Sequence, residues 1–253
     1  MGHEGQGAPV RQRTVGIIGG VSDVATVEYY RKLNAHVRAM AGGANIARTL
    51  VDGLNVAEVI DWLTRGDEAA MEAAFEEAVD RLLRAGADTV LCASNTCHKA
   101  LDAIAARRDF PHIHIADATA AALREAGVRR AVLLGSMETM EEPFLRQRLS
   151  RHGVETVVPA AADRREVDRV IFEELVEGRF RARSRLAYVS IARHCMAEQG
   201  AQGVILGCTE IGQLVGQADM PDVPVFDTTD IHCRAAARFA LARARSDRAV
   251  EAA

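Results

Sequence analysis

Two segments of the sequence place a small reactive side chain at the same distance from a Gly-Ala pair. Ser94 lies eight residues after Gly86, and Cys208 lies eight residues after Gly200. In each segment a short apolar run separates the pair from the reactive residue. A hydroxyl and a thiol on opposite walls of a cleft can remove a proton from one face of a carbon atom and return a proton to the other face. The spacing therefore predicts proton transfer at a stereocentre.

A second pair of segments supports an internal duplication. Val15–Gly20, followed by Thr26, is echoed by Val132–Ser136, followed by Thr139. With 253 residues the chain can form one large α/β domain or two small ones. The repeat favours two halves, each of which presents one small polar side chain at a turn from a strand to a helix.

Cys208 is the first candidate for a catalytic group. A free thiol has a pKa of about 8.5, and a helix N-terminus lowers this pKa because the helix dipole stabilises the thiolate. Since a predicted helix begins at Glu210, we expect a partly ionised thiolate near neutral pH. A buried structural cysteine is the more common case after an apolar strand. The polar turn Gly207–Glu210, directly after the strand, favours a functional role here.

Asn95, Thr96 and Thr209 place amide and hydroxyl donors next to two predicted helix N-termini. Such donors, together with the backbone N–H groups there, form a site for a carboxylate. Ordinary helix capping explains one such residue, but it does not explain a matching cluster in each half. His98, one turn into its helix, has two interpretations: it orients a catalytic group, or it is an imidazole of the core or surface.

Composition excludes several classes of partner. The formal net charge is −4 and the sequence has no basic run, so we expect neither a nucleic-acid nor an anionic-membrane partner. No apolar stretch approaches about 20 residues, and the first residues lack the apolar region of a signal peptide. We therefore expect a cytoplasmic protein with disordered tails over residues 1–13 and 244–253.

The cysteines and histidines do not predict a metal site. The five cysteines include no CxxC motif, so free thiols are expected. His112 and His114 alternate on a short predicted strand, but no third ligand lies at a zinc spacing. Gly19-Gly20 belongs to neither of the common phosphate-loop motifs. We expect neither a metal nor a nucleotide cofactor.

The elements that must position these residues alternate between short apolar runs and amphipathic stretches. The predicted strands are Val15–Ile18, Ala47–Val51, Thr89–Cys92, Ala131–Leu134, Thr156–Val158, Val204–Leu206 and a short strand around Val225–Phe226. The predicted helices are Ala25–Met40, Asp67–Ala85, His98–Arg107, Met140–Arg151, Arg165–Glu177, Arg183–Gln199, Glu210–Val215 and Asp230–Arg243. This alternation predicts an α/β fold with parallel sheets and helices on both faces. Ligands of such sheets bind at the carboxyl ends of the strands, where Ser94, Cys208, Gly20 and Ser136 all lie.

At these residues the chain resembles the aspartate/glutamate racemase superfamily, and most closely its broad-specificity amino-acid racemase branch. The matching stretches are Ile17–Gly20 with Thr26, Ser94–Lys99, Ile115–Thr119, Ile171–Leu175, Gly200–Ile211 and Val225–Thr228. The resemblance implies two flavodoxin-like domains that face each other across the active-site cleft, no cofactor, and commonly a homodimer. We expect domains over residues 14–118, closed by the helix at about 225–243, and 119–224. The resemblance also implies that each domain supplies one acid/base residue for an amino-acid substrate.

The sequence departs from this family at one important position, because the first family cysteine falls on Ser94. Cys92 lies on the preceding strand and Cys97 inside the following helix turn, so we expect neither to share the position of Ser94. An alcohol ionises less readily than a thiol, so Ser94 should donate a proton more easily than it abstracts one. The resemblance implies that Cys208 faces the hydrogen of the L-enantiomer.

The remaining predictions concern the pocket wall and the substrate side chain. We expect Gly20, Ser22, Ser136 and Glu210 to line the substrate pocket. An acidic substrate, aspartate or glutamate, needs a cation for its distal carboxylate, and the candidates are Arg48 and then Arg164.

Two alternative functions remain open. One is a decarboxylase or isomerase of a substituted dicarboxylate in which Cys208 alone protonates a carbanion. The other is a non-catalytic protein that binds an amino acid. Release of carbon dioxide, or binding without turnover, would distinguish them from a racemase.

Overall fold

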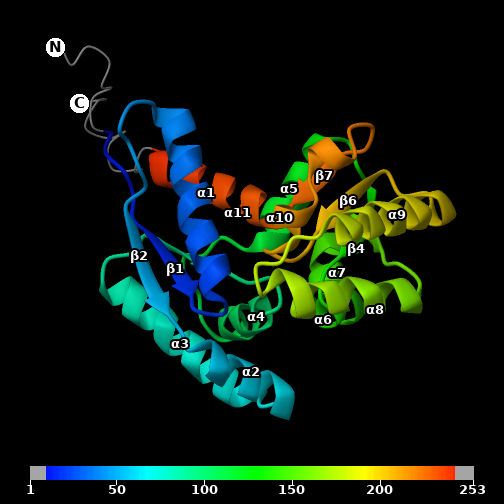
Figure 1. Cartoon of the computed structure of the whole chain (residues 1–253). Helices are drawn as coiled ribbons and strands as arrows, with labels where there is room; N and C mark the ends of the chain where they lie inside the picture. Colours follow the sequence, from blue (N-terminus) through cyan, green and yellow to red (C-terminus); the bar gives the residue numbers. More distant parts are fainter. Residues whose placement is uncertain (1–9, 243–253) are drawn as a thin grey trace. The chain divides into compact units, whose positions relative to one another are not determined.

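The computed structural model describes residues 10–242 (Figure 1), so most of the two predicted tails lies outside the described residues. The described chain divides into two compact units. The first contains the chain up to Ala93, Ala100–Ile113 and the chain from Cys233 onward. The second contains Ser94–Lys99 and His114–His232. The domain boundaries expected from the sequence stay a prediction.

The first unit is built on the parallel sheet β2-β1-β3, formed by β1 (Val15–Gly19), β2 (Thr49–Gly53) and β3 (Thr89–Cys92). Its helices are α1 (Asp23–Ala41), α2 (Val56–Arg65), α3 (Glu68–Arg84) and most of α4 (His98–Arg107) and α11 (Thr228–Leu241). β1 is buried along its whole length, which is typical of a parallel strand covered on both faces.

Helices pack on both faces of this sheet. Val15 and Ile17 of β1 form one buried cluster with Leu33 of α1 and with Ala236 of α11. On the other face, a Cβ atom on Gly16 would lie only 3.3 Å from the Cβ atom of Leu82 in α3. Glycine at this position therefore lets α3 approach the sheet closely.

The second unit is built on the parallel sheet β5-β4-β6-β7, formed by β4 (Arg130–Leu134), β5 (Glu155–Val157), β6 (Gly203–Leu206) and β7 (Val225–Asp227). Its helices include α5 (Ile115–Glu125), α6 (Met137–Glu141), α7 (Pro143–Arg151), α8 (Ala161–Val170), α9 (Ala182–Gln199) and α10 (Ile211–Leu214). A π-helical turn, η1 (Ile171–Leu175), follows α8, and a 3₁₀ turn, η2 (Gln217–Asp219), follows α10.

Alternate residues of β4 point into two different cores of the second unit. Val132 and Leu134 pack with α8, η1, α9 and α10. Ala131 and Leu133 pack with α5 and α7. The sheet of this unit is thus covered by helices on both faces, as the sequence predicts.

The two sheets share one plan, which supports the predicted duplication. In each, the first strand pairs with the second on one side and with the third on the other, as in flavodoxin-like folds. Thr26 and Thr139 also match: a Cβ atom on Gly19 would lie 2.6 Å from Thr26 Cγ2, and one on Gly135 would lie 2.8 Å from Thr139 Cγ2. The predicted α/β class with parallel sheets is confirmed.

Several predicted helices need correction. The helix expected over 140–151 is divided into α6 and α7, because Glu142 is extended and Pro143 begins a new helix. The segment expected as a helix over 165–177 ends in the π-helical turn η1. Helices α2 and α5 were not expected, and the strand expected at His112 is reduced to one isolated bridge with Val90.

Candidate active site

The loop that carries Ser94 belongs to the second unit, although β3 before it belongs to the first. Asn95 is 4% exposed, and its Nδ2 donates a hydrogen bond to Thr228 Oγ1 over 3.1 Å. The Thr228 hydroxyl in turn donates to the carbonyl oxygen of Leu206 over 2.8 Å. Leu206 is the last residue of β6. These two bonds hold the loop at the carboxyl end of the strand that precedes Cys208.

A row of hydroxyls forms a second link at the same edge of the sheet. Thr96 Oγ1 lies 3.3 Å from Thr139 Oγ1, which lies 3.1 Å from Ser136 Oγ. The methyl group of Thr139 packs under the next turn, because a Cβ atom on Gly207 would lie 3.3 Å from it. The structure thus brings Thr96 and Ser136 together beside the turn that carries Cys208.

Cys208 has a carboxylate as a hydrogen-bond partner. Its Sγ donates a hydrogen bond to Glu210 Oε2 over 3.0 Å, and the Thr209 hydroxyl donates to the same oxygen. Glu210 is 5% exposed. The expected role of Glu210 was a substrate contact, but its carboxylate is bonded to the candidate catalytic residue.

The environment raises the pKa of Cys208 well above its ordinary value, so the predicted lowering is wrong. Burial is the largest cause, and the negative charge of Glu210 adds to it. The backbone N–H groups of Glu210 and Ile211 lower the pKa, but they do not outweigh these effects. The helix that follows, α10, has only four residues, so its dipole is weak.

This arrangement can store and release a proton at Cys208. The thiol form is held by the Glu210 carboxylate, and the thiolate form has two backbone N–H donors ready for it. Tyr188 lies behind the site, where burial and then the charge of Cys208 raise the pKa of its hydroxyl, which donates to Val167 O over 2.6 Å. Tyr188 therefore stays protonated and serves as packing.

Ser94 lies beside a thiol that was not expected to share its position. Ser94 Oγ accepts a hydrogen bond from the backbone N–H of Cys97 over 3.3 Å. Burial raises the pKa of the Cys97 thiol to about 11, although the hydroxyl of Ser94 and the charge of Lys99 lower it. The turn between β3 and α4 brings residues three apart together, and this places Cys97 next to Ser94. Cys92 is buried within β3.

His98 holds the Ser94 turn through a hydrogen bond to its backbone. The imidazole is fully buried, and its Nδ1 lies 2.6 Å from the carbonyl oxygen of Ser94. Its Nε2 accepts a hydrogen bond from the backbone N–H of Ile115 over 3.3 Å. The network therefore assigns the proton to Nδ1. The edge of His114 packs on this ring with centroids 4.5 Å apart, and His114 Nδ1 caps α5.

Three predicted residues belong to the first unit. Gly20 and Ser22 follow the carboxyl end of β1, where the Ser22 hydroxyl caps α1 by accepting from the N–H of Ala25 over 3.1 Å. Arg48 lies just before the amino end of β2. Because β1 and β2 are parallel, Arg48 is at the opposite end of the strands from Gly20 and Ser22. The structure therefore does not bring Arg48 together with Gly20 and Ser22.

The second candidate cation is already engaged in the second unit. Arg164 donates to Glu141 Oε1 over 3.0 Å and to the carbonyl oxygen of Pro159 over 2.7 Å. Among residues 10–242, no group of three or more His, Cys, Asp or Glu side chains is arranged to hold a metal ion. No helix within this part of the chain is long and apolar enough to cross a membrane.

Comparison with known proteins places these features in context. Residues 18–236 match the profile of the Asp/Glu/hydantoin racemase family. The structure of a candidate Asp/Glu racemase from Yersinia pestis is 41% identical, with a TM-score of 0.84 over 91% of this chain and 100% of that one. An aspartate racemase homologue from Pyrococcus horikoshii OT3 is 32% identical, with a TM-score of 0.77 over 88% and 96% of the two chains. Aspartate racemase from Picrophilus torridus, 21% identical with a TM-score of 0.66 over 89% and 93%, shares the fold.

Proposed function

Because the chain belongs to the Asp/Glu/hydantoin racemase family, and racemases are isomerases, we propose that it is a cofactor-independent amino-acid racemase or epimerase. Cys208 is one acid/base group, and Ser94 is its counterpart. The hydrogen bond between Cys208 Sγ and Glu210 Oε2 carries this proposal, because it gives the thiol a place to leave its proton.

The first proton transfer uses Cys208 and Glu210. Glu210 takes the thiol proton, and the resulting thiolate is stabilised by the backbone N–H groups of Glu210 and Ile211. The thiolate then removes the hydrogen from Cα of the L-amino acid, and the electron pair of the C–H bond remains on carbon. The Cys208 thiol is thereby restored.

The second transfer returns a proton to the opposite face of Cα. Ser94 donates its hydroxyl proton, directly or through a water that it holds, and the Cys97 thiol beside it can replace that proton. Exchange with solvent then removes the proton from Glu210 and returns one to Cys97, which resets the enzyme, and the reverse reaction runs through the same groups. Since the free energies of two enantiomers are equal, a weak base at Ser94 lowers kcat/KM in both directions alike.

An unpartnered atom supports an amino acid as the ligand. Asn95 Oδ1 is buried and has no hydrogen-bond partner among the described residues. A buried acceptor of this kind costs free energy unless a donor reaches it, and the α-ammonium group of an amino acid is such a donor. The hydroxyl of Thr96 remains a proposed contact of the α-carboxylate, whereas the Thr209 hydroxyl already donates to Glu210 Oε2 and has to turn away from it to bind the carboxylate. Ser136 is proposed for the pocket wall, and the pocket roles of Gly20 and Ser22 stay predictions.

The side chain of the substrate is best found by a screen. Arg164 is already bonded to Glu141 and to the carbonyl oxygen of Pro159. Arg48 lies at the amino ends of the strands of its sheet, whereas Gly20 follows a carboxyl end. Neither observation favours an acidic side chain over another. We therefore propose a screen of all L-amino acids, with aspartate and glutamate included. The homodimer and the cytoplasmic location stay predictions.

The decisive experiment is exchange of the Cα hydrogen in heavy water. Each L-amino acid is incubated with the full chain, and loss of the Cα proton signal is followed together with chiral chromatography. We expect exchange and formation of the D-enantiomer for at least one amino acid, and neither with the Cys208→Ala variant. Absence of exchange for every amino acid would contradict the proposal.

A further inference from the structure

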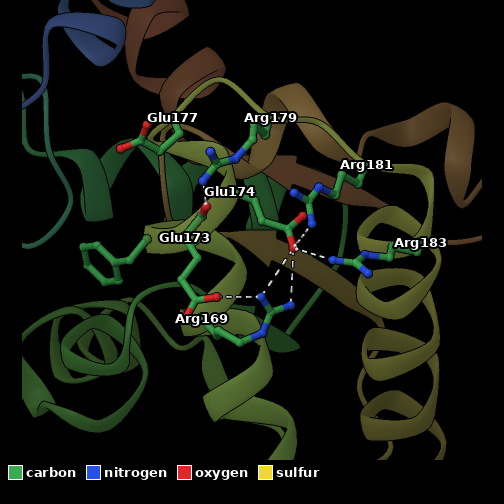
Figure 2. Close-up of a pocket in the computed structure, with 8 residues that line it drawn as sticks. Arg169, Glu173, Glu174, Glu177, Arg179, Arg181 and Arg183 are labelled. Carbon is green, nitrogen blue, oxygen red and sulfur yellow. Dashed lines mark hydrogen bonds and ion pairs between the residues drawn. The ribbon is translucent and has the colours of Figure 1, made fainter.

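Residues 169–183 of the second unit surround a pocket that the proposed racemase chemistry does not use (Figure 2). The pocket has a volume of about 450 Å³. It is lined by Arg169, Arg179, Arg181 and Arg183, together with three glutamates and Phe172. The η1 segment, one of the stretches that resemble the racemase superfamily, forms part of its wall. We refer to it as the arginine pocket.

Three of the arginines converge on a single carboxylate oxygen. Glu174 is 1% exposed, and its Oε2 accepts a hydrogen bond from Ser184 Oγ over 2.7 Å. Its Oε1 lies 3.4 Å from Arg169 Nη1, and 3.6 Å from the nearest nitrogen of each of Arg181 and Arg183 (Figure 2). This oxygen marks the point at which the three guanidinium groups meet.

The contacts of Arg181 and Arg183 leave their donors available. A separation of 3.6 Å is too long for a hydrogen bond, and Glu174 is the only ion-pair partner of either residue within the described chain. Arg179 donates to the carbonyl oxygen of Glu173 rather than to a carboxylate. Each guanidinium carries five N–H donors, so the pocket holds many more donors than its own carboxylates engage.

The charge balance of the pocket favours an anion. Arg169 is already paired with Glu166 over 2.8 Å and with Glu173 over 2.9 Å, which leaves Arg179, Arg181 and Arg183 facing Glu174 and Glu177. Phe172 is 56% exposed and adds an apolar wall. The volume is in the range of sites for small molecules. Guanidinium groups recognise carboxylates and phosphates through paired hydrogen bonds.

We propose that the arginine pocket binds a small oxyanion with at least two negative charges, either a phosphate compound or a di- or tricarboxylate, through Arg179, Arg181 and Arg183. The backbone at the site supports a role beyond packing. η1 is a π-helical turn, with Val176 N bonded to Ile171 O over 3.0 Å, and such turns occur often at functional sites.

The wall of the arginine pocket packs against the elements that carry the candidate active site. Ile171 and Leu175 of η1 pack in one buried cluster with Ile211 and Leu214 of α10, and Cys208 packs against the same cluster. A ligand that changes η1 is therefore one packed layer from the helix that follows Cys208.

The competing interpretation is a structural one, in which Glu174 only fixes the arginines and the π-helical turn. The two interpretations differ in whether an added anion binds. Binding is measured by isothermal titration calorimetry on the full chain at low ionic strength, with inorganic pyrophosphate and citrate as separate probes. This readout does not depend on racemase activity, so its failure is independent of the function proposed above.

We expect the wild-type chain to bind one equivalent of at least one probe, and the probe that binds identifies phosphate or carboxylate as the ligand group. Arg181→Ala/Arg183→Ala should weaken binding about tenfold or more. Arg181→Lys/Arg183→Lys should also weaken it, because lysine keeps the charge but loses the paired hydrogen bonds. The control is Arg193→Ala, since Arg193 lies on α9 and pairs with Asp222 instead.

A further variant, Glu174→Gln, should increase the affinity of the pocket for the anion. Glu174→Gln removes the carboxylate that competes for the arginines, so a folded variant should bind pyrophosphate more tightly than wild type. Circular dichroism establishes that each variant is folded. The proposal is overturned if folded wild-type protein binds neither probe, or if Arg193→Ala weakens binding as much as the double variant.

Discussion

Cys208 Sγ and Glu210 Oε2 lie 3.0 Å apart, with the thiol as the hydrogen-bond donor. A carboxylate at this distance opposes ionisation of the thiol by charge, and it also accepts the proton that ionisation releases. The same residue thus sets both the acidity of Cys208 and the destination of its proton. Two measurements on one variant, Glu210→Gln, separate these effects.

Glu210→Gln should lower the pKa of Cys208, because the variant removes a negative charge that disfavours the thiolate. At a given pH the variant then holds more thiolate, so alkylation of Cys208 by iodoacetamide should begin at a lower pH than in wild type. Mass spectrometry of the Cys208 peptide measures this. Racemisation should nevertheless fall, because the proton acceptor is gone. A profile that moves to higher pH would contradict the assignment, and Glu198→Gln serves as the exposed control.

Ser94→Cys should increase racemisation, because a thiol is a stronger acid and a better base than an alcohol at neutral pH. The gain should be equal for L-to-D and D-to-L turnover, since the equilibrium constant between enantiomers is unity. Chiral chromatography of initial rates in both directions measures it. Cys208→Ser, which makes the reverse exchange at the other position, should lower the rate by about 10² to 10⁴-fold. An unchanged rate in a folded Ser94→Cys variant would show that Ser94 is not an acid/base group.

His98 can be tested with two amides that each keep one of its hydrogen bonds. Asparagine retains a donor near Nδ1 for the carbonyl of Ser94, whereas glutamine retains an acceptor near Nε2 for the N–H of Ile115. We expect His98→Asn to keep more of kcat than His98→Gln, with similar losses of Tm. The comparison of kcat with Tm distinguishes positioning of Ser94 from general stability. Equal kcat values in the two variants would assign His98 to the core alone.

Gly20→Ala should destabilise the first unit more than a simple change of backbone freedom would. Gly20 has a φ of +74°, and an added Cβ atom would lie 1.9 Å from Leu54 O. Leu54 is held there by its N–H bond to Gly19 O over 3.0 Å. Gly66 is a matched control, with a φ of +63° and open space around the added atom. We expect a loss of about 1 kcal/mol for Gly66→Ala and about 3 kcal/mol or more for Gly20→Ala, measured by urea unfolding.

Much of the architecture follows from patterns that a single sequence displays. β3 and α4 begin and end where the sequence predicts, because a short run with three apolar residues and a following amphipathic stretch are strong local signals. α2 was not expected, although the sequence contains a capping residue before it, Asn55, and a terminating glycine after it, Gly66. α5 had a weaker signal, since its cap is His114 rather than one of the common capping residues.

The site was less predictable, because its properties depend on contacts between distant segments. Asn95 meets Thr228 only in the folded chain, although the Asp227-Thr228 pair belonged to a matching stretch. Thr139 was visible as the counterpart of Thr26, but its contact with Thr96 was not. The predicted lowering of the pKa of Cys208 was wrong because that pKa depends first on burial of the thiol and then on the position of the Glu210 carboxylate, and a single sequence determines neither.

The position of α11 has a consequence for how the protein is made. Cys233, Ala236, Ala237 and Ala240 complete the buried cluster that contains Val15 and Ile17 of β1. This helix leaves the ribosome only after every strand of the other sheet has been synthesised. The apolar surface of β1 that this helix covers therefore stays unfilled until translation has passed Ala240.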